Sequence, residues 1–223
     1  MKTLPPQRGF TLIELLVVIG LIAVLAGGIG LSIGGGDKSN GIKSAQNIIS
    51  SLLSGARGQA ALSQTDAAIV VNVTTTDENF LRELRIVKKN ADNKWIVAGN
   101  PIFLDKGVYL VPRQSSGLPT TNVSFDTTNG PWTDLYSTAY DTTDIGPLYF
   151  DDAGLNPISS AKYRILRSFT SLGTTSDGKI VLTTADLTGP NQLKFNNPNN
   201  VRGVKISKYG VTTLINEAEG FRN

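Results

Sequence analysis

The stretch RGFTLIELLVVIGLIAVLAGGIGLSI, residues 8–33, decides the architecture of the N-terminal part of this chain. From Phe10 to Gly36 the only charged side chain is Glu14. At about 1.5 Å per helical residue, residues 10–33 are long enough to cross a hydrocarbon core of roughly 30 Å. The sequence therefore predicts a transmembrane helix over residues 10–33.

The short leader before this helix, residues 1–9, contains Lys2 and Arg8 and no acidic residue. Positively charged flanks stay on the cytoplasmic side of a membrane, so we expect the globular part to face outward. An ordinary secretory signal also combines positive residues with an apolar run, but it has a shorter run and a small-residue cleavage site. The long run and the absence of a clear A-x-A site favour membrane retention over simple secretion.

Glu14 needs an explanation because a carboxylate near the start of a membrane helix is costly without a partner. In a bundle of parallel, axially staggered copies, it could pair with the amino group that a cut before Phe10 would create on a neighbour. Such a buried pair would favour register and assembly more than stability. The alternative is a carboxylate that stays hydrated near the headgroups, and physical reasoning alone leaves both open.

The segment Arg8–Ile19 resembles the class III signal of prepilins, with Gly before the cut, Phe after it and Glu fifth in the mature chain. This resemblance to the type IV pilin and type II secretion pseudopilin class implies recognition of a leader containing Arg8, cleavage between Gly9 and Phe10 by the prepilin peptidase, and N-methylation of Phe10. It implies a role for Glu14 in assembly. It also implies a single-pass inner-membrane protein with a cytoplasmic N-terminus and a periplasmic C-terminal domain. The partners it implies are the prepilin peptidase, the inner membrane and other pilins or pseudopilins in a helical fibre.

The next segment is first glycine-rich and then amphipathic. Glycine is frequent in residues 27–36, where helix is intrinsically weak, so this stretch is either a hinge or an ordinary linker. From Asp37 onward, apolar residues recur at the three- and four-residue spacings of one helix face. Asp37 or Ser39 is expected to cap this second half of the long helix. The stripe that we expect to pack on a sheet consists of Ile42, Ala45, Ile48, Ile49, Leu52, Leu53, Ala56 and Ala60.

The rest of the chain is rich in strand patterns. Strands are predicted at residues 67–74, 84–88, 95–98, 107–112, 147–150, 179–184, 204–207 and 211–215, with hairpin turns at 90–93 and 208–210. The predicted fold class is therefore α+β and pilin-like, with one long N-terminal helix packed on antiparallel β-sheet. The expected organisation is a leader at 1–9, a transmembrane and assembly helix at 10–33, a linker and the amphipathic half of the helix at 34–64, and a β-rich globular periplasmic domain at 65–223.

Three polar segments are predicted as loops, at residues 114–144, 168–178 and 188–200. The first is long for a compact domain, and such loops are usually functional or disordered. Its aromatic residues Trp132, Tyr136 and Tyr140 form either a contact surface or an anchor onto the same domain.

Composition argues against catalysis. The 223 residues include no cysteine and no histidine, which excludes disulfides and thiolate metal sites and removes the commonest general base. The net charge of +3 is small and spread along the chain. One cluster of acidic residues is dense enough to suggest paired carboxylates or a calcium site, and it consists of Asp141, Asp144, Asp151 and Asp152. Their spacing is not that of an EF-hand. We expect a structural protein without enzymatic activity, cofactor or metal.

Short later segments resemble, in the same order, the minor pseudopilin family that includes general secretion pathway protein H and the FimT proteins. They are residues 52–57, 60–61, 68–73, 150–154 and 202–210. This resemblance implies a minor subunit of a type II secretion pseudopilus that takes part in protein transport.

The alternative is a minor pilin of a type IV pilus that is adhesive or binds DNA during uptake. FimT-type relatives that bind DNA typically carry Arg directly after the glycine of the last hairpin, whereas here Val211 follows Gly210. The cations Arg202, Lys205 and Lys208 form either a strip that contacts nucleic-acid phosphates or a solvated face.

Overall fold

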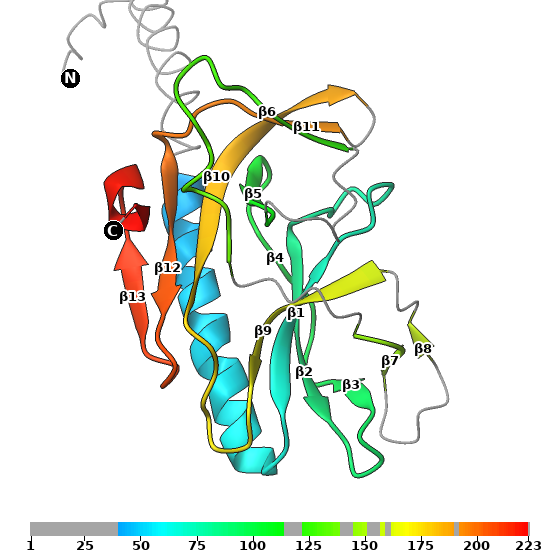
Figure 1. Ribbon diagram of the computed structural model, residues 1–223. Helices are drawn as coiled ribbons and strands as arrows, with labels where there is room; N and C mark the ends of the chain where they lie inside the picture. The colour runs from blue at the N-terminus through cyan, green and yellow to red at the C-terminus, as the bar shows by residue number, and fades with distance from the viewer. Residues whose placement is uncertain are drawn as a thin grey trace, which may run out of the picture. The chain divides into compact units, whose positions relative to one another are not determined.

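The computed structural model describes residues 40–113, 122–138, 145–150, 157–158, 162–189 and 192–222. In these residues a helix at 40–63 packs against two β-sheets (Figure 1). The strands are β1 (Ala67–Asn72), β2 (Glu83–Lys89), β3 (Trp95–Val97), β4 (Ile102–Phe103), β5 (Val108–Leu110), β6 (Val123–Phe125), β7 (Leu148–Tyr149), β8 (Pro157–Ile158), β9 (Tyr163–Phe169), β10 (Gly178–Gly189), β11 (Gln192–Phe195), β12 (Val201–Ile206) and β13 (Thr212–Ile215). A short 3-10 helix, η3 (Ala218–Phe221), follows β13.

The helix packs its predicted apolar stripe against the sheets. Seven of the eight stripe residues are at most 3% exposed, and Ile48 is partly buried against the same core. The helix ends at residue 63, and Gln64 follows with a φ of 53°, in the left-handed conformation common after a helix end. The amphipathic half of the helix is therefore confirmed from residue 40 onward. The caps expected at Asp37 or Ser39, and the membrane-spanning half, lie outside the described residues.

The first sheet has the strand order β8-β7-β3-β2-β1-β9, and β4 pairs with β2. All six residues of β1 are buried. Ala67, Ile69 and Val71 face the core that contains the helix, whereas Ala68 and Val70 face a second, smaller cluster. Because both faces of the sheet are covered at β1, this strand is apolar from Ala67 to Val71 without alternation.

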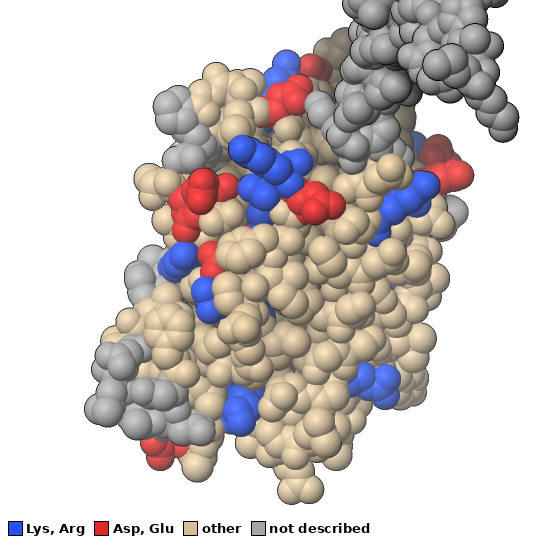
Figure 2. All heavy atoms as spheres, turned by 180° about the vertical axis from the view of Figure 1, so that it is seen from behind, with Lys and Arg blue, Asp and Glu red and all other residues tan. Residues whose placement is uncertain are grey.

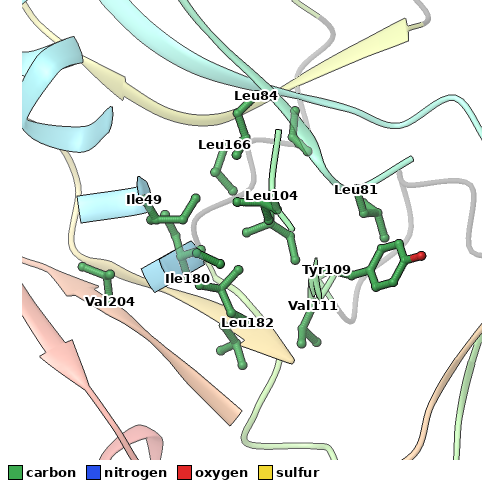
Figure 3. Close-up of a cluster of buried hydrophobic side chains, with 14 of the residues drawn as sticks. Ile49, Leu81, Leu84, Leu104, Tyr109, Val111, Leu166, Ile180, Leu182 and Val204 are labelled. Atoms are coloured by element: carbon green, nitrogen blue, oxygen red, sulfur yellow. The ribbon is translucent and has the colours of Figure 1, made fainter. Parts of the chain in front are cut away.

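The second sheet has the order β13-β12-β10-β11-β6, and β5 pairs with β10. The long strand β10 pairs with β12 along its first half and with β11 near its end. Ile180 and Leu182 of β10 and Val204 of β12 lie with Ile49 of the helix and Leu166 of β9 (Figure 3). The main core therefore lies between the helix and both sheets.

All eight predicted strands are confirmed, with shifted ends, as β1, β2, β3, β5, β7, β10, β12 and β13. The expected antiparallel pairing is confirmed for most of the strand pairs, but β3 pairs with β7 and β6 pairs with β11 in parallel. The prediction of a loop at 188–200 is wrong, since β10 continues to Gly189 and β11 lies inside this segment. Strand β6 lies within the segment 114–144 that was predicted as a loop.

Strand β9 is the longest element that the sequence pattern did not predict. Its register against β1 shifts between Ile69 and Val70, so that Ile69 pairs with Arg167 and Val70 with Ile165. The extra residue of this bulge disturbs the alternation of side chains along β9. Two arginines in seven residues further hide its apolar pattern.

Candidate functional site

The residues predicted to carry processing and assembly belong to the N-terminal segment. Arg8, Gly9, Phe10 and Glu14 lie outside the described residues, as does the predicted membrane helix at 10–33. Within the parts of the chain that the structure describes, no helix is both long and apolar enough to cross a membrane. The roles assigned to these four residues therefore stay predictions.

The strip predicted as a phosphate contact lies on β12 and the turn after it. Lys205 is exposed and pairs in register with Lys179 of β10. Arg202 lies three residues earlier in the same strand and points to the opposite face, because side chains alternate along a strand. Lys208 is exposed in the turn, with its Nζ 5.1 Å from the centroid of the Tyr209 ring. The structure thus does not bring Arg202 and Lys205 onto one face.

Lys179, the neighbour of Lys205 across the sheet, is used inside the fold. Its Nζ donates hydrogen bonds to the carbonyl oxygens of Asp134 and, at 2.9 Å, of Phe221. Burial lowers the pKa of Lys179 below its usual value. The negative charge of Asp134 raises this pKa, whereas the positive charge of Lys205 lowers it. Through these hydrogen bonds Lys179 connects β10 to the segment around residue 134 and to the C-terminal 3-10 helix.

Two aromatic residues of the predicted loop at 114–144 pack onto their own domain. Trp132 is 2% exposed, and its ring centroid lies 5.3 Å from that of Phe125. Tyr136 contacts the same Phe125 ring at 5.1 Å, and Phe125 stacks on Phe195 at 5.2 Å. The structure therefore favours the anchoring role for Trp132 and Tyr136, whereas Tyr140 lies outside the described residues.

The acidic group considered for catalysis or calcium binding, Asp141, Asp144, Asp151 and Asp152, lies outside the described residues. Among the residues that are described, no group of three or more His, Cys, Asp and Glu side chains could hold a metal ion.

A buried polar network that sequence analysis missed joins β2 to β9. Glu83 is 3% exposed and accepts hydrogen bonds from the Tyr163 hydroxyl at 2.6 Å and from Arg85 Nε at 2.9 Å. Lys162 Nζ lies 3.3 Å from Glu83 Oε2 and 3.0 Å from Asp77 Oδ2. Burial is the largest influence on the pKa of Glu83 and raises it. The hydrogen bonds and the charges of Lys162 and Arg85 outweigh burial, so the pKa lies below its usual value. This network stabilises the ionised carboxylate and holds distant parts of the chain together.

The buried side chain of Gln46 binds the helix to the C-terminal hairpin. Gln46 is 3% exposed, and its Nε2 donates to the carbonyl oxygens of Gly203 at 2.8 Å and of Ile215 at 2.9 Å. Gly203 is required at this point because a Cβ there would lie 2.0 Å from the Ile180 carbonyl oxygen. The hairpin of β12 and β13 is therefore attached to the helix by a specific polar contact as well as by the core.

A largely apolar groove of about 430 Å³ lies between the helix, β2 and β4. Its lining residues are Ser44, Asn47, Ile48, Ser51, Leu52, Ile86 and Ile102. The helix lies behind β10 and β12 in Figure 1, so it faces the viewer in Figure 2. On this side, charged side chains gather toward one end and leave a broad area that carries few charges (Figure 2).

Comparison with known proteins places the N-terminal segment in a recognised class. Residues 4–30 match the prokaryotic N-terminal methylation motif. This match confirms the resemblance to type IV pilins and pseudopilins and supports a pilin-like or pseudopilin-like structural subunit. A comparison with curated protein sequences found no match.

Solved structures show only a distant likeness. Two structures of the minor pseudopilin EpsH from the type II secretion system of Vibrio cholerae align at 13% and 14% identity, with TM-scores of 0.41 and 0.43, over 78% and 80% of this chain and 96% of theirs. The type IV minor pilin FimU of Pseudomonas aeruginosa aligns at 13% identity and a TM-score of 0.38, over 78% of this chain and 88% of its own.

Proposed function

We propose that this protein is a structural subunit of a type II secretion pseudopilus, assembled from the inner membrane after cleavage by the prepilin peptidase. The observation that carries the proposal is the N-terminal methylation motif at residues 4–30, in which Gly9, Phe10 and Glu14 hold the positions expected of a prepilin. The peptidase removes residues 1–9, and the new N-terminus at Phe10 is methylated.

The N-terminal segment then acts as anchor and as assembly helix. Residues 10–33 hold the subunit in the inner membrane with the β-rich domain in the periplasm, and they pack in parallel with those of other subunits in the fibre. Glu14 sets the stagger by pairing with the amino group of a neighbour's Phe10, because a carboxylate in this apolar segment needs a partner.

The proposed system is secretion, and the proposed subunit is a minor one. The order of the short segments that resemble the pseudopilin H and FimT family supports this choice. The alternative is a minor pilin of a type IV pilus. Its DNA-binding form receives less support, since Arg202 and Lys205 point to opposite faces of β12 and Val211 replaces the arginine expected after the hairpin glycine.

The first test is the intact mass and N-terminal sequence after co-expression with a prepilin peptidase. The expected product begins at Phe10 and carries one added methyl group, and Gly9→Val is expected to leave the precursor uncut. A product that still begins at Met1, or one cut beyond residue 33, overturns the proposal.

The role of Glu14 is tested separately in cells that form the fibre. Glu14→Ala is expected to leave cleavage intact and to reduce the amount of subunit recovered in sheared fibres. Thr11→Ala, in the same segment, serves as a matched control and is expected to assemble normally. Equal recovery of both variants contradicts the assignment of Glu14.

A further inference from the structure

A second pocket, which the proposed function does not use, lies beside the first residues of β10. Its volume is about 460 Å³, within the range typical of small-molecule sites. Two of the residues that line it are cations, and four carry a hydroxyl group. These lining residues are Arg113, Thr133, Asp134, Tyr136, Ser137, Thr138 and Lys179. The walls of this pocket therefore present hydrogen-bond donors, unlike the largely apolar groove beside the helix.

Hydrogen bonds to β10 hold two of these hydroxyl groups in place. Ser137 is fully buried, and its Oγ accepts a hydrogen bond from Val181 N at 2.9 Å. Thr138 Oγ1 accepts one from Lys179 N at 2.9 Å, and Thr138 N donates to the Lys179 carbonyl oxygen. A hydroxyl group that accepts one hydrogen bond still has a proton to donate. Both hydroxyl groups can therefore donate to a ligand in the pocket.

Positive charge exceeds negative charge around the pocket. Lys179 Nζ donates to the carbonyl oxygens of Asp134 and Phe221, and an ammonium group has a third proton that is available to a ligand. Lys205 lies opposite Lys179 in the register of β10 with β12. Among the described residues that line the pocket, Asp134 is the one acid, against the two cations Arg113 and Lys179. An anion bound there is attracted by several cations and repelled by a single carboxylate.

A further cation lies behind the wall that Thr138 forms. Arg167 is only 5% exposed and donates a hydrogen bond to Ser176 Oγ through Nη1. A Cβ at Gly178 would lie 2.1 Å from Arg167 Nη2 and 3.3 Å from Thr138 Oγ1, so the guanidinium group is close to this wall. Because Arg167 is buried, its charge is screened by salt less than the charge of an exposed arginine. This charge adds to the attraction of the pocket for an anion.

We propose that this pocket binds a small anion with two or more carboxylate groups. The planar guanidinium group of Arg113 matches one carboxylate, and the third proton of Lys179 together with the hydroxyl groups matches another. Phosphate sites commonly present a run of backbone N–H groups from a tight turn. Here the N–H of Thr138 is used by β10, and the lining residues that the structure describes include no glycine.

Two sources of such carboxylates share this chemistry, a free di- or tricarboxylic acid and neighbouring acidic side chains of another polypeptide. Isothermal titration calorimetry of the full-length protein in a nonionic detergent compares citrate, a capped tetraglutamate peptide, acetate and inorganic phosphate. Citrate or the peptide is expected to bind roughly tenfold more tightly than acetate, because a second carboxylate adds charge-assisted hydrogen bonds.

Removal of a cation from the pocket tests which residues bind the ligand. Arg113→Gln is expected to weaken binding roughly tenfold, because it replaces charge-assisted hydrogen bonds by neutral ones. Lys106→Gln is the matched control, since it also removes one positive charge but lies at an exposed position that does not line the pocket. It is expected to bind as the unmodified protein does.

A carboxylate placed in the pocket gives a second test that leaves Arg113 intact. Thr133 is exposed and lines the pocket, so Thr133→Glu is expected to abolish binding by repelling the ligand and by occupying the cations itself. Ser54→Glu, at an exposed position of the helix outside the pocket lining, is the control and is expected to bind normally. Thermal unfolding of all four variants reports whether the domain stays folded.

The outcomes decide both the chemistry and the source of the ligand. Binding of citrate alone identifies a free acid, and binding of the peptide alone identifies acidic side chains of a polypeptide. No binding of either, phosphate binding as tight as that of citrate or the peptide, or equal binding within either pair of variant and control overturns the proposal. None of these results bears on the proposed function, because cleavage before Phe10 does not involve the pocket.

Discussion

Gln46 is a polar residue within the apolar face of the helix, and its replacement by glutamate tests how the C-terminal hairpin is attached. Its amide nitrogen donates to two carbonyl oxygens, of Gly203 and Ile215. Glutamate has nearly the same shape, but its carboxylate cannot donate a hydrogen bond and faces both carbonyl oxygens. Burial and the two carbonyl dipoles disfavour the ionised form, so we expect the pKa of the new carboxyl to rise above that of an exposed glutamate.

The expected magnitude follows from these contacts. At low pH the protonated carboxyl keeps one of the two hydrogen bonds, so the free energy of unfolding falls by about 1 kcal/mol. At pH 7 the carboxyl is largely ionised, and a pKa raised by about 2 units adds nearly 3 kcal/mol to this deficit, a figure that already includes the loss of the second hydrogen bond, so the total is about 4 kcal/mol. A group whose pKa is raised in the folded state loses its stabilising contribution as pH rises, so the deficit of Gln46→Glu grows from pH 4 to pH 7.

The measurement is denaturant unfolding of the full-length protein in detergent, followed by tryptophan fluorescence at pH 4 and pH 7. Comparing each variant with the unmodified protein at the same pH removes the titration of other carboxyls. The matched control is Asn47→Asp, the same chemical change at the next, exposed position, which we expect to shift stability by less than about 0.5 kcal/mol. An equal deficit of Gln46→Glu at both pH values, or an equal effect of Asn47→Asp, refutes the reasoning.

Three further predictions concern stability. The free energy of unfolding is expected to fall as pH drops below about 4.5, because the lowered pKa of Glu83 makes a stabilising contribution that is lost as pH falls through the folded-state pKa. Glu83→Gln should make the free energy of unfolding less dependent on pH in an acid titration, and an unchanged pH profile would contradict this role of Glu83. Gly203→Ala places a Cβ against the Ile180 carbonyl oxygen and should cost about 3 kcal/mol, seen as a lower Tm; a Tm equal to that of the unmodified protein contradicts the close approach. Trp132→Ala should cost about 3–5 kcal/mol in denaturant unfolding because it removes a ring packed against Phe125 and Phe195, and a loss below about 1 kcal/mol contradicts the anchoring role.

Local pattern was sufficient for most of the regular structure. The apolar stripe of the helix repeats at three- and four-residue spacings, and this periodicity alone identified its buried face, since the helix geometry determines which residues share a side. The hairpin turns at 90–93 and 208–210 were predictable for a similar reason. Asn93 and Gly210 adopt positive φ angles, and these residue types tolerate them better than most.

The pairing of strands could be predicted less well from the sequence than the helix and the turns, because paired strands lie far apart along the chain. The bulge between β1 and β9 depends on residues 69–70 meeting residues 165–167, which neither segment shows by itself. The parallel pairing of β6 with β11 places a strand in a segment whose polar composition suggested a loop. The packing of Phe125 and Phe195 against Trp132 compensates for that polar composition.

The sequence alone identified the processing motif, the apolar segment at 10–33 and the amphipathic helix, because each of these depends on residues that are neighbours along the chain. The tertiary structure was needed for the Glu83 network, the Gln46 contact with the hairpin and the groove beside Ile102. Each of these brings together side chains from segments separated by tens of residues. Sequence spacing does not encode such distances, so only the packing of the helix against both sheets decides them.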